Sequence, residues 1–554
     1  MTKKIPYILF YWLIVSLIIP NVVLSVTESL TVWGRMANIL LPLGIVGLLA
    51  SISKKVGITA WLMFPLAFLG AFQLVLLSLY GNGIISVDML LNLVTTNCSE
   101  ACELLREMWP SLVLVIVMYL APLVAAVYCL CHRLRLSGSF MRLNRRVFLC
   151  VSAIGAVLLA ICYCQGGGYD IRRDLYPVNV GYNIHLAAKR FGQTRRYHDT
   201  SADFDYEAVS AHSQADEERY IIVIGETSRA HNWQICGYGR PTNPLLSKRS
   251  DLIVARSAYS ESNTTHKSVP MLLSCVDSRS FDKELYQVKS LISAFKECGF
   301  HTSFISNQLP NHSYIDFFGE EADTTIFVKL QPDFSGDTTD EDLLRYVKKC
   351  LNPKHRKQLI VLHTYGSHFD YQERYGSPDH VFTPDTYNGA SSEYREELVN
   401  AYDNSIVATD RLLNTIIERL EDCHCVSGML YISDHGEDLF DDGGSRFLHS
   451  SPTPTEYQLH VPLLVWLSPE YNAKYPEVGN TLSINSGKII STSRSFCATS
   501  LGVGGICTSK TDDSDNLAST AFRQKPLYYL DDHNVALPFT PKKYLPKYHA
   551  SLTR

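Results

Sequence analysis

The chain has 554 residues, a formal net charge of −5 and 15 cysteines, and 46% of its residues are hydrophobic. This length exceeds what one ordinary hydrophobic core serves, so more than one domain is expected. The slight acidic excess argues against a nucleic-acid-binding protein, which needs a basic surface. The apolar runs are concentrated in about the first 165 positions, and the remainder has the composition of a soluble domain.

Five stretches in this first part are long and apolar enough to cross a bilayer, which needs about 20 residues for each span. The predicted spans are residues 5–24, 36–52, 58–80, 109–131 and 146–165. The first stretch is too long for the apolar segment of a signal peptide, and no small-residue cleavage site stands out. We therefore expect a membrane domain of five helices, residues 1–166.

The charges of the connecting loops predict the orientation of these spans, because cytoplasmic loops are enriched in Lys and Arg. Basic residues stand before the first span, between the second and third, and between the fourth and fifth: Lys3, Lys4, Lys54, Lys55, Arg133, Arg135, Arg142, Arg145 and Arg146. The alternate loops are poor in both residue types. The N-terminus is therefore expected in the cytoplasm, and everything after about residue 166 outside the membrane.

Cysteine usage agrees with an oxidising compartment for this outer part. Eight cysteines follow residue 217, an even number that suggests disulfides without revealing their pairing. The segment Cys423-His424-Cys425 could be a fragment of a metal site, but a disulfide or free thiols fit this short pattern better.

Residues 167–217 are expected to form a linker between the membrane part and the soluble part. The segment NIHLAAKRFGQTRRYH (183–198) is basic and partly amphipathic. Such a helix can lie on a lipid surface or be an ordinary solvated helix, and the sequence leaves both interpretations open.

From residue 218 onward, strand and helix patterns alternate, which predicts an α/β domain with a mostly parallel sheet over 218–554. Short apolar, β-branched runs predict strands within residues 220–226, 301–308, 358–368, 428–438 and 460–467. Helical patterns lie between them, at 287–298 and 393–420. In such sheets, ligands bind at the carboxyl ends of the strands.

Acidic and histidine side chains follow several of these predicted strands: Glu226, His368, Asp434, His435 and His449. A single acid at a strand end is more often a helix cap or a solvated loop residue, and a single histidine is more often a satisfied surface or core group. The run from Asp434 to Asp438 is a stronger signal, because a buried strand has little reason to end in so many ionisable groups unless a cation neutralises them. These residue types are ligands for zinc, or for manganese where oxygen ligands dominate. Glu437 and Asp438 are interpreted as outer neighbours of the ion or as solvated groups.

The stretch ESNTTHKSVPMLL (261–273) places several hydroxyls before a proline and an apolar helical run. A hydroxyl at a helix N-terminus faces the positive end of the dipole and free backbone N–H groups, which together bind phosphate well. A nearby metal ion lowers the hydroxyl pKa and makes it a nucleophile. The pattern therefore indicates phosphoryl or sulfuryl transfer through a covalent Thr or Ser intermediate, with the residue still open.

Six segments, in order, resemble motifs of the bacterial phosphoethanolamine transferases: GETSRAHNWQICGYGRPTNP (225–244), SNTTHKSVP (262–270), LHTYGSH (362–368), YDNSIVATD (402–410), SDHGED (433–438) and FLHS (447–450). That family includes lipid A modifying enzymes behind polymyxin resistance and has the alkaline phosphatase (sulfatase-like) fold. The resemblance implies five transmembrane helices in the bacterial inner membrane and a periplasmic catalytic domain.

The resemblance also implies roles for individual residues. The nucleophile would be Thr265, because the threonine of the family stands five residues before the proline of its SVP motif, here Pro270. One zinc ion, with room for a second, would be held by Glu226, Thr265, Asp434 and His435. Substrate contacts would come from His368 and His449, which could instead hold the second zinc, and from Asn97 and Glu100 in a periplasmic loop helix (94–105).

Two features depart from the pattern of the family. A disulfide that often brackets the nucleophile segment is absent, since Glu261 and Met271 occupy its positions. Lys267 adds a cation two residues after Thr265, where it could bind phosphate or only solvate a loop. Phosphate is the favoured interpretation, and the role of His266 stays open.

The resemblance implies a ping-pong transfer of phosphoethanolamine from phosphatidylethanolamine, through Thr265, to an acceptor outside the membrane. Lipid A is the first expected acceptor, with core oligosaccharide and periplasmic glucans as alternatives, and the protein is expected to be a monomer.

A phosphoglycerol transferase of the same fold is a further alternative, which the 225–244 block disfavours. A sulfatase would need a C/S-x-P-x-R motif, which is missing. A non-catalytic binding protein would be expected to lack one of the zinc residues, and none is missing.

Overall fold

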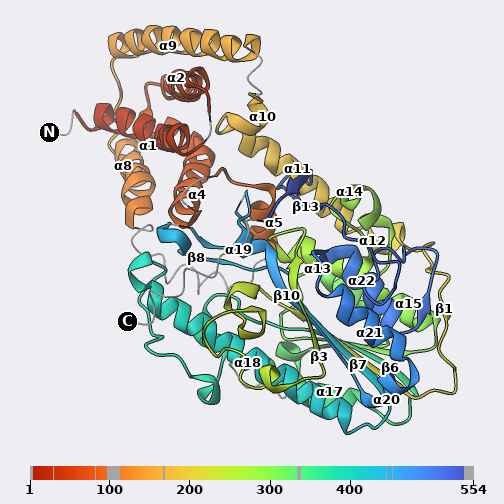
Figure 1. The fold of residues 1–554 in the computed structure, drawn as a ribbon. Coiled ribbons are helices and arrows are strands. Elements are labelled where there is room, and N and C mark those ends of the chain that lie inside the picture. Colours follow the sequence, from red (N-terminus) through yellow and green to blue (C-terminus); the bar gives the residue numbers. More distant parts are fainter. Residues whose placement is uncertain are drawn as a thin grey trace. The chain divides into compact units, whose positions relative to one another are not determined.

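The computed structural model describes residues 4–28, 30–80, 83–95, 113–165, 169–332, 338–444, 446–451 and 453–541. The chain folds as two compact units, one made mainly by residues up to Lys189 and the other mainly by residues from Arg190 onward. Figure 1 shows the helices of the first unit and the sheet of the second.

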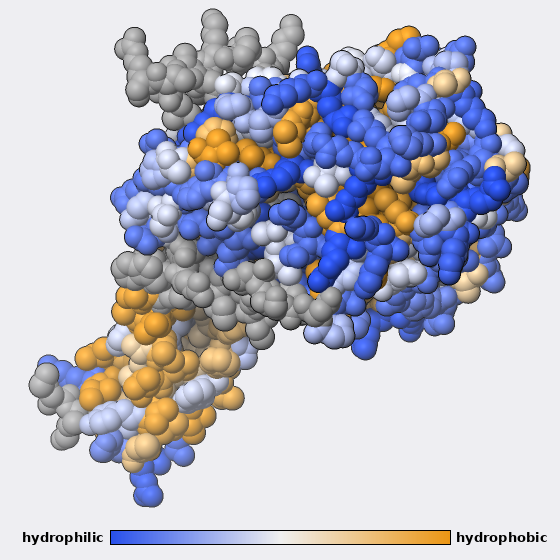
Figure 2. Space-filling model, turned by 90° about the horizontal axis from the view of Figure 1, so that it is seen from below, coloured by the Kyte–Doolittle hydropathy of each residue, from blue (hydrophilic) through white to orange (hydrophobic). Residues whose placement is uncertain are grey.

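The first unit is helical. Its main helices are α1 (Ile5–Thr27), α2 (Val32–Ala50), α3 (Val56–Leu62), α4 (Phe64–Tyr80), α5 (Val87–Thr95), α8 (Ala121–Cys131) and α9 (Gly138–Cys164). Four stretches within the described residues are helical, long and apolar enough to cross a membrane, and the α3–α4 pair makes a fifth if it counts as one span. Exposed apolar side chains gather over this unit, as expected for lipid-facing helices (Figure 2).

Two of the predicted spans differ from the structure in detail. The third is a pair of helices bent by 58° rather than one continuous helix. The fifth begins at Gly138, eight residues before the predicted start, where the Ser137 hydroxyl accepts a hydrogen bond from Phe140 N at 3.3 Å. The predicted start followed hydropathy, which marks only where the continuous apolar residues begin. The helix itself starts earlier, at its cap, because the arginines before the apolar run are compatible with helical structure.

Small residues allow α2 and α9 to pack closely. A Cβ added at Gly44 would lie 2.5 Å from Ser152 N, and one added at Gly155 would lie 2.5 Å from Leu41 N. Glycine at these contacts lets two backbones approach, which is a common device between membrane helices.

The second unit is built on an eight-stranded sheet in the order β11-β3-β10-β7-β2-β6-β4-β5. The strands are β2 (Glu218–Gly225), β3 (Leu252–Tyr259), β4 (His301–Ser306), β5 (Thr324–Phe327), β6 (Lys357–His363), β7 (Val426–Ser433), β10 (His460–Leu467) and β11 (Ile490–Ser491). β10 runs antiparallel to both of its neighbours, β3 and β7, and the other described strand pairs of this sheet are parallel. The predicted mostly parallel α/β fold is therefore confirmed, as are the five predicted strands.

Helices cover both faces of this sheet. In Figure 1, α17 (Leu343–Cys350) and α18 (Arg395–Glu421) lie on one side, and α13 (Thr265–Ser274), α15 (Leu291–Glu297) and α22 (Thr492–Val503) on the other. The central strand β2 is buried along its whole length, with Ile222 and Ile224 facing the core on the α13 side. Burial on both faces explains why these strands are continuous apolar runs. The predicted helices at 287–298 and 393–420 correspond to α15 and α18.

A buried polar cluster stabilises the amino-terminal end of β2, which is the end of the strand opposite to Glu226. The Glu218 carboxylate is bonded to His212 Nδ1 at 2.9 Å, Lys357 Nζ at 2.7 Å and the Tyr220 hydroxyl at 2.8 Å. Burial raises the pKa of Glu218, but these three hydrogen bonds outweigh it and hold the pKa below its ordinary value.

Candidate functional site

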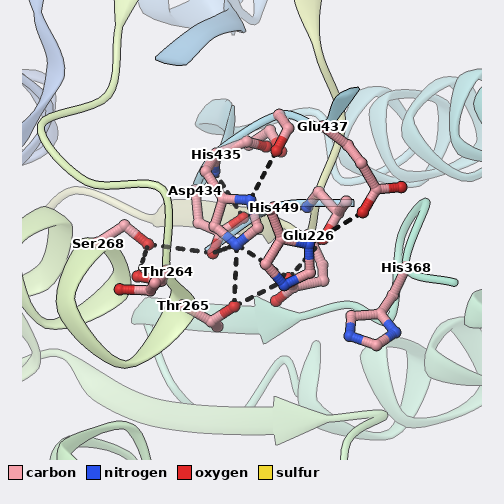
Figure 3. A network of polar contacts seen from close by, with 12 residues as sticks. Glu226, Thr264, Thr265, Ser268, His368, Asp434, His435, Glu437 and His449 are labelled. Atoms are coloured by element: carbon pink, nitrogen blue, oxygen red, sulfur yellow. Dashed lines mark hydrogen bonds and ion pairs between the residues drawn. The ribbon is translucent and has the colours of Figure 1, made fainter. Parts of the chain in front are cut away.

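The carboxyl ends of the two central strands bring three predicted ligands together. Glu226 follows β2, and Asp434 and His435 follow the neighbouring parallel strand β7. All three side chains are buried, and one ligand atom from each lies within 4.8 Å of the others. The His435 Nε2 atom lies 3.5 Å from Glu226 Oε1 and 3.4 Å from Asp434 Oδ2. The structure thus forms the cluster that the strand-end pattern predicts (Figure 3).

The first residue of α13 brings a hydroxyl to this cluster. Thr265 Oγ1 donates to Glu226 Oε1 at 2.9 Å and lies 3.2 Å from His435 Nε2. The helix continues through Pro270 to Ser274, and its residues from Lys267 onward are buried. The hydroxyl therefore sits on a rigid element, at the positive end of a ten-residue helix.

A disulfide anchors the far end of this helix. Cys275, the residue after α13, is bonded to Cys497 in α22. It is the one disulfide among the described cysteines, and the sequence leaves this pairing open. Instead of a bracketing bridge, the buried Glu261 carboxylate accepts from Ser278 N at 2.7 Å and from the Ser491 hydroxyl at 2.6 Å.

Neighbouring groups orient each member of the cluster. Asp434 Oδ1 accepts from Thr227 N at 3.1 Å, and Asp434 Oδ2 accepts from the Ser268 hydroxyl at 3.0 Å. His435 Nδ1 lies 2.9 Å from the Gly436 carbonyl and donates to it, which leaves Nε2 as a lone-pair donor toward the cluster. The backbone is strained here, because the β-branched Thr227 has a φ of 58°.

The charge of the cluster is unbalanced among its own residues. Burial disfavours charge on His435, but Asp434 and Glu226 outweigh it and hold the pKa of His435 above its ordinary value. Two buried carboxylates facing one imidazole and one hydroxyl leave an excess of negative charge. A divalent cation would neutralise this excess.

The two further histidines form the side of the site next to this cluster. The His449 ring lies 4.4 Å from the His435 ring and 5.7 Å from the His368 ring, measured between centroids. In Figure 3, His368 stands beside the bonded network without joining it. Burial lowers the pKa of His368 to about 4 and that of His449 to about 3, so both are neutral at physiological pH.

A buried carboxyl group holds His449 in place. Glu437 Oε2 lies 2.9 Å from His449 Nδ1, and the Tyr371 hydroxyl donates to Glu437 Oε1. Burial raises the pKa of Glu437 to about 8. The histidine–carboxyl pair is therefore uncharged near neutral pH, and Glu437 is a buried group rather than a solvated one.

Of the three other predicted substrate contacts, Lys267 alone lies within the described residues. Lys267 is 2% exposed, and its Nζ donates to the Asp531 carbonyl at 2.9 Å, so a role in binding phosphate finds no support. Asn97 and Glu100 lie outside the described residues. Ser262 and Thr264 bond to each other through their hydroxyls at 3.1 Å, and the Thr264 side chain does not cap α13 although the residue stands at the N-cap.

Gln308 is a site residue that the sequence interpretation missed. Its Nε2 donates to Glu226 Oε2 at 3.2 Å and to the Thr364 carbonyl at 2.9 Å. Gln308 follows β4, so it obeys the same rule that indicates the other strand-end residues. The apolar run at 301–308 includes Gln308 within the predicted strand, and an amide carries no ionisable group that would mark it as a ligand.

Comparison with known proteins identifies the family. The sulfatase family matches residues 218–496, about half of the chain. Phosphoethanolamine transferase EptA of Escherichia coli strain K12 is 30% identical over 311 residues, which are 55% of this chain and 56% of the relative. Kdo(2)-lipid A phosphoethanolamine 7''-transferase of Salmonella typhimurium is 27% identical over 269 residues, 48% of this chain and 46% of the relative. The chain thus matches about half the length of these curated relatives.

Solved structures share the fold. Lipooligosaccharide phosphoethanolamine transferase A (EptA) of Neisseria meningitidis, an integral membrane protein, matches with a TM-score of 0.74 at 19% identity, over 93% of this chain and 97% of that chain. The periplasmic domain of EptC from Escherichia coli, in a complex with zinc, matches with a TM-score of 0.55 at 22% identity, over 60% and 95%. The chain therefore belongs to the sulfatase family, with the fold of its phosphoethanolamine transferases.

Proposed function

We propose that the protein transfers phosphoethanolamine from phosphatidylethanolamine to lipid A through a covalent intermediate on Thr265. This proposal rests mainly on the position of the Thr265 hydroxyl at the start of a buried helix, 2.9 Å from Glu226 Oε1 and 3.2 Å from His435 Nε2. The names of the matched relatives support this class of reaction, and the Kdo(2)-lipid A enzyme supports the acceptor.

The donor set fits a zinc ion held by Glu226, Thr265, Asp434 and His435. Buried carboxylate and imidazole ligands within 4.8 Å of one another are typical of zinc, and the EptC periplasmic domain that shares this fold forms a complex with the same metal. When bound, the ion would lower the pKa of the Thr265 hydroxyl and offset charge on the phosphoryl oxygens. The neutral His368 and His449 can contact a phosphoryl oxygen or hold a second zinc.

In the first half-reaction, Thr265 Oγ1 attacks the phosphorus of phosphatidylethanolamine. Glu226 accepts the hydrogen bond of this hydroxyl, so its carboxylate is placed to receive the proton. A Thr265 O–P bond forms, the P–O bond to diacylglycerol breaks, and diacylglycerol leaves with a proton on its oxygen. The N-terminus of α13 favours the negative charge that builds on the phosphoryl oxygens.

In the second half-reaction, an oxygen of the acceptor attacks the same phosphorus from the opposite side. The Thr265 O–P bond breaks, Thr265 Oγ1 takes up the proton that the attacking acceptor oxygen gives up, and phosphoethanolamine is now on the acceptor. Donor and acceptor are both amphiphiles, which gives a reason for membrane-spanning helices in the same chain. We place residues 1–166 in the bacterial inner membrane, 167–217 as linker and 218–554 in the periplasm of a monomeric enzyme.

The test compares Thr265→Ala with Thr264→Ala in the full-length protein expressed in bacterial membranes. Mass spectrometry of lipid A should show added phosphoethanolamine with the unchanged protein and with Thr264→Ala, and none with Thr265→Ala. Without acceptor, the intact mass of the purified protein should rise by one phosphoethanolamine group on Thr265. Transfer that persists in Thr265→Ala would contradict the assignment of Thr265 as the nucleophile. Modification of core sugars or glucans instead of lipid A would show that these glycans are the acceptor.

A further inference from the structure

An open hollow of about 770 Å³ lies in the helical unit, between the loop from α2 to α3 and the loop from α8 into α9. The two loops are joined by a main-chain hydrogen bond from Leu136 N to Lys54 O at 2.9 Å. Five exposed cationic side chains line the hollow: Lys54, Lys55, Arg135, Arg142 and Arg145. None of the described residues that line it is acidic.

The start of α9 adds to this positive charge. Gly138, the first residue of this 27-residue helix, lines the hollow, and no acidic residue stands in the first turn. The Lys54 ammonium lies 3.6 Å from the position that a Cβ at Gly138 would take. A cation beside the positive end of a helix is unfavourable by itself. The arrangement therefore favours an anion in the hollow, which would neutralise both.

One of the arginines is held in place by the protein. Arg145 Nε donates to the Ser51 carbonyl at 2.8 Å, and Arg145 Nη2 donates to the Ile52 carbonyl at 3.1 Å. A guanidinium has five N–H donors, so most of them remain for a ligand. Its fixed position lowers the entropic cost of binding.

We infer that this hollow binds the phosphate headgroup of an anionic phospholipid from the inner leaflet. The basic loop residues predict that the hollow lies on the cytoplasmic side of the membrane. The headgroups of anionic phospholipids are present at that membrane surface. Its wall also has apolar parts, since Ile52 is 62% exposed and Ile58 is 39% exposed. Cations beside exposed isoleucines suit a headgroup with attached acyl chains better than a free soluble anion. The residues of this hollow differ from those of the proposed transfer site, and the inference does not rest on the transfer reaction.

Basic residues on cytoplasmic loops also orient membrane helices, so the test needs a variant of equal charge. Arg135→Gln/Arg142→Gln removes two cations that line the hollow. Arg133→Gln/Arg146→Gln removes two exposed cations of the same loop and helix that do not line it. Full-length protein in detergent is mixed with equal amounts of phosphatidylglycerol and phosphatidylcholine, and retained lipid is measured by native mass spectrometry. Glycerol 3-phosphate, which carries the phosphate without acyl chains, is added as a competitor.

The unchanged protein should retain one phosphatidylglycerol in preference to phosphatidylcholine. Each cation near an anionic headgroup contributes on the order of a five-fold change in affinity, so the Arg135/Arg142 variant should lose about 25-fold. The Arg133/Arg146 variant should retain the lipid. Equal loss in both variants, or no preference for phosphatidylglycerol, would overturn the inference. Displacement by glycerol 3-phosphate would overturn it as well, because the site would then take a soluble anion.

Discussion

In the proposed zinc site, replacing Gln308 by Leu should weaken zinc binding while leaving every proposed zinc ligand in place. The Gln308 amide holds Glu226 Oε2 at 3.2 Å, while the other oxygen, Oε1, faces Thr265 and His435. A hydrogen bond to a charged group contributes about 1.5–3 kcal/mol, and removing the partners that orient a metal ligand lowers affinity about 10- to 100-fold. The single contact at 3.2 Å is long, so we expect the lower end, about tenfold, or about 1.4 kcal/mol.

Zinc affinity can be measured by stripping the purified full-length protein with a chelator and titrating zinc against a fluorescent competitor. Gln331→Leu is the matched control, because it loses a 3.1 Å hydrogen bond to the Phe327 carbonyl outside the site. Transfer activity of Gln308→Leu should recover as zinc is raised. A zinc Kd equal to that of the unchanged protein would refute the reasoning that Gln308 positions Glu226.

Three further perturbations follow from the structure. Gly366→Ala should lower zinc affinity and transfer, because Gly366 has a φ of +55° and an added Cβ would lie 2.5 Å from the Glu226 carbonyl oxygen; unchanged values in the same titration would contradict this. Cys275→Ser/Cys497→Ser should lower the Tm through a loss of about 2–4 kcal/mol, checked by calorimetry against the unchanged protein with and without reductant. Because the folded-state pKa of Glu218 is lowered from 4.5, its contribution to stability is complete above about pH 4.5 and is lost as the pH falls through the folded pKa. Glu218→Gln should therefore flatten the dependence of Tm on pH in this acid range, and an unchanged slope would count against it.

The strands and the chemistry at their ends were predictable from short segments. The run at 460–467 matches β10, and the other predicted strands lie within two residues of their observed starts. A strand buried on both faces must be apolar along its whole length, so its ionisable end stands out. The same rule did not find β3, where most residues are partly buried or exposed, or β5, where all residues are only partly buried.

Other features depend on contacts between distant segments. The disulfide joins cysteines 222 residues apart in the sequence. The hydrogen bond between Glu261 and Ser491 forms because β11 pairs with β3. The burial of Lys267 against the Asp531 carbonyl could not be foreseen from a polar stretch next to a proline. Charge in a sequence does not say whether the residue faces a ligand or the chain itself.

The sequence by itself determined the alternation of strands and helices, the apolar helical region and the residue types that follow the central strands, because each of these depends on local periodicity and hydropathy. Only the tertiary structure decided which groups meet. The parallel pairing of β2 with β7 places Glu226 beside Asp434, and the packing of α13 brings the hydroxyl of Thr265, rather than those of its neighbours, to both Glu226 and His435. The physical reason is that a metal or phosphate site needs donors within a few ångströms, and that distance is set by the packing of elements far apart in the chain.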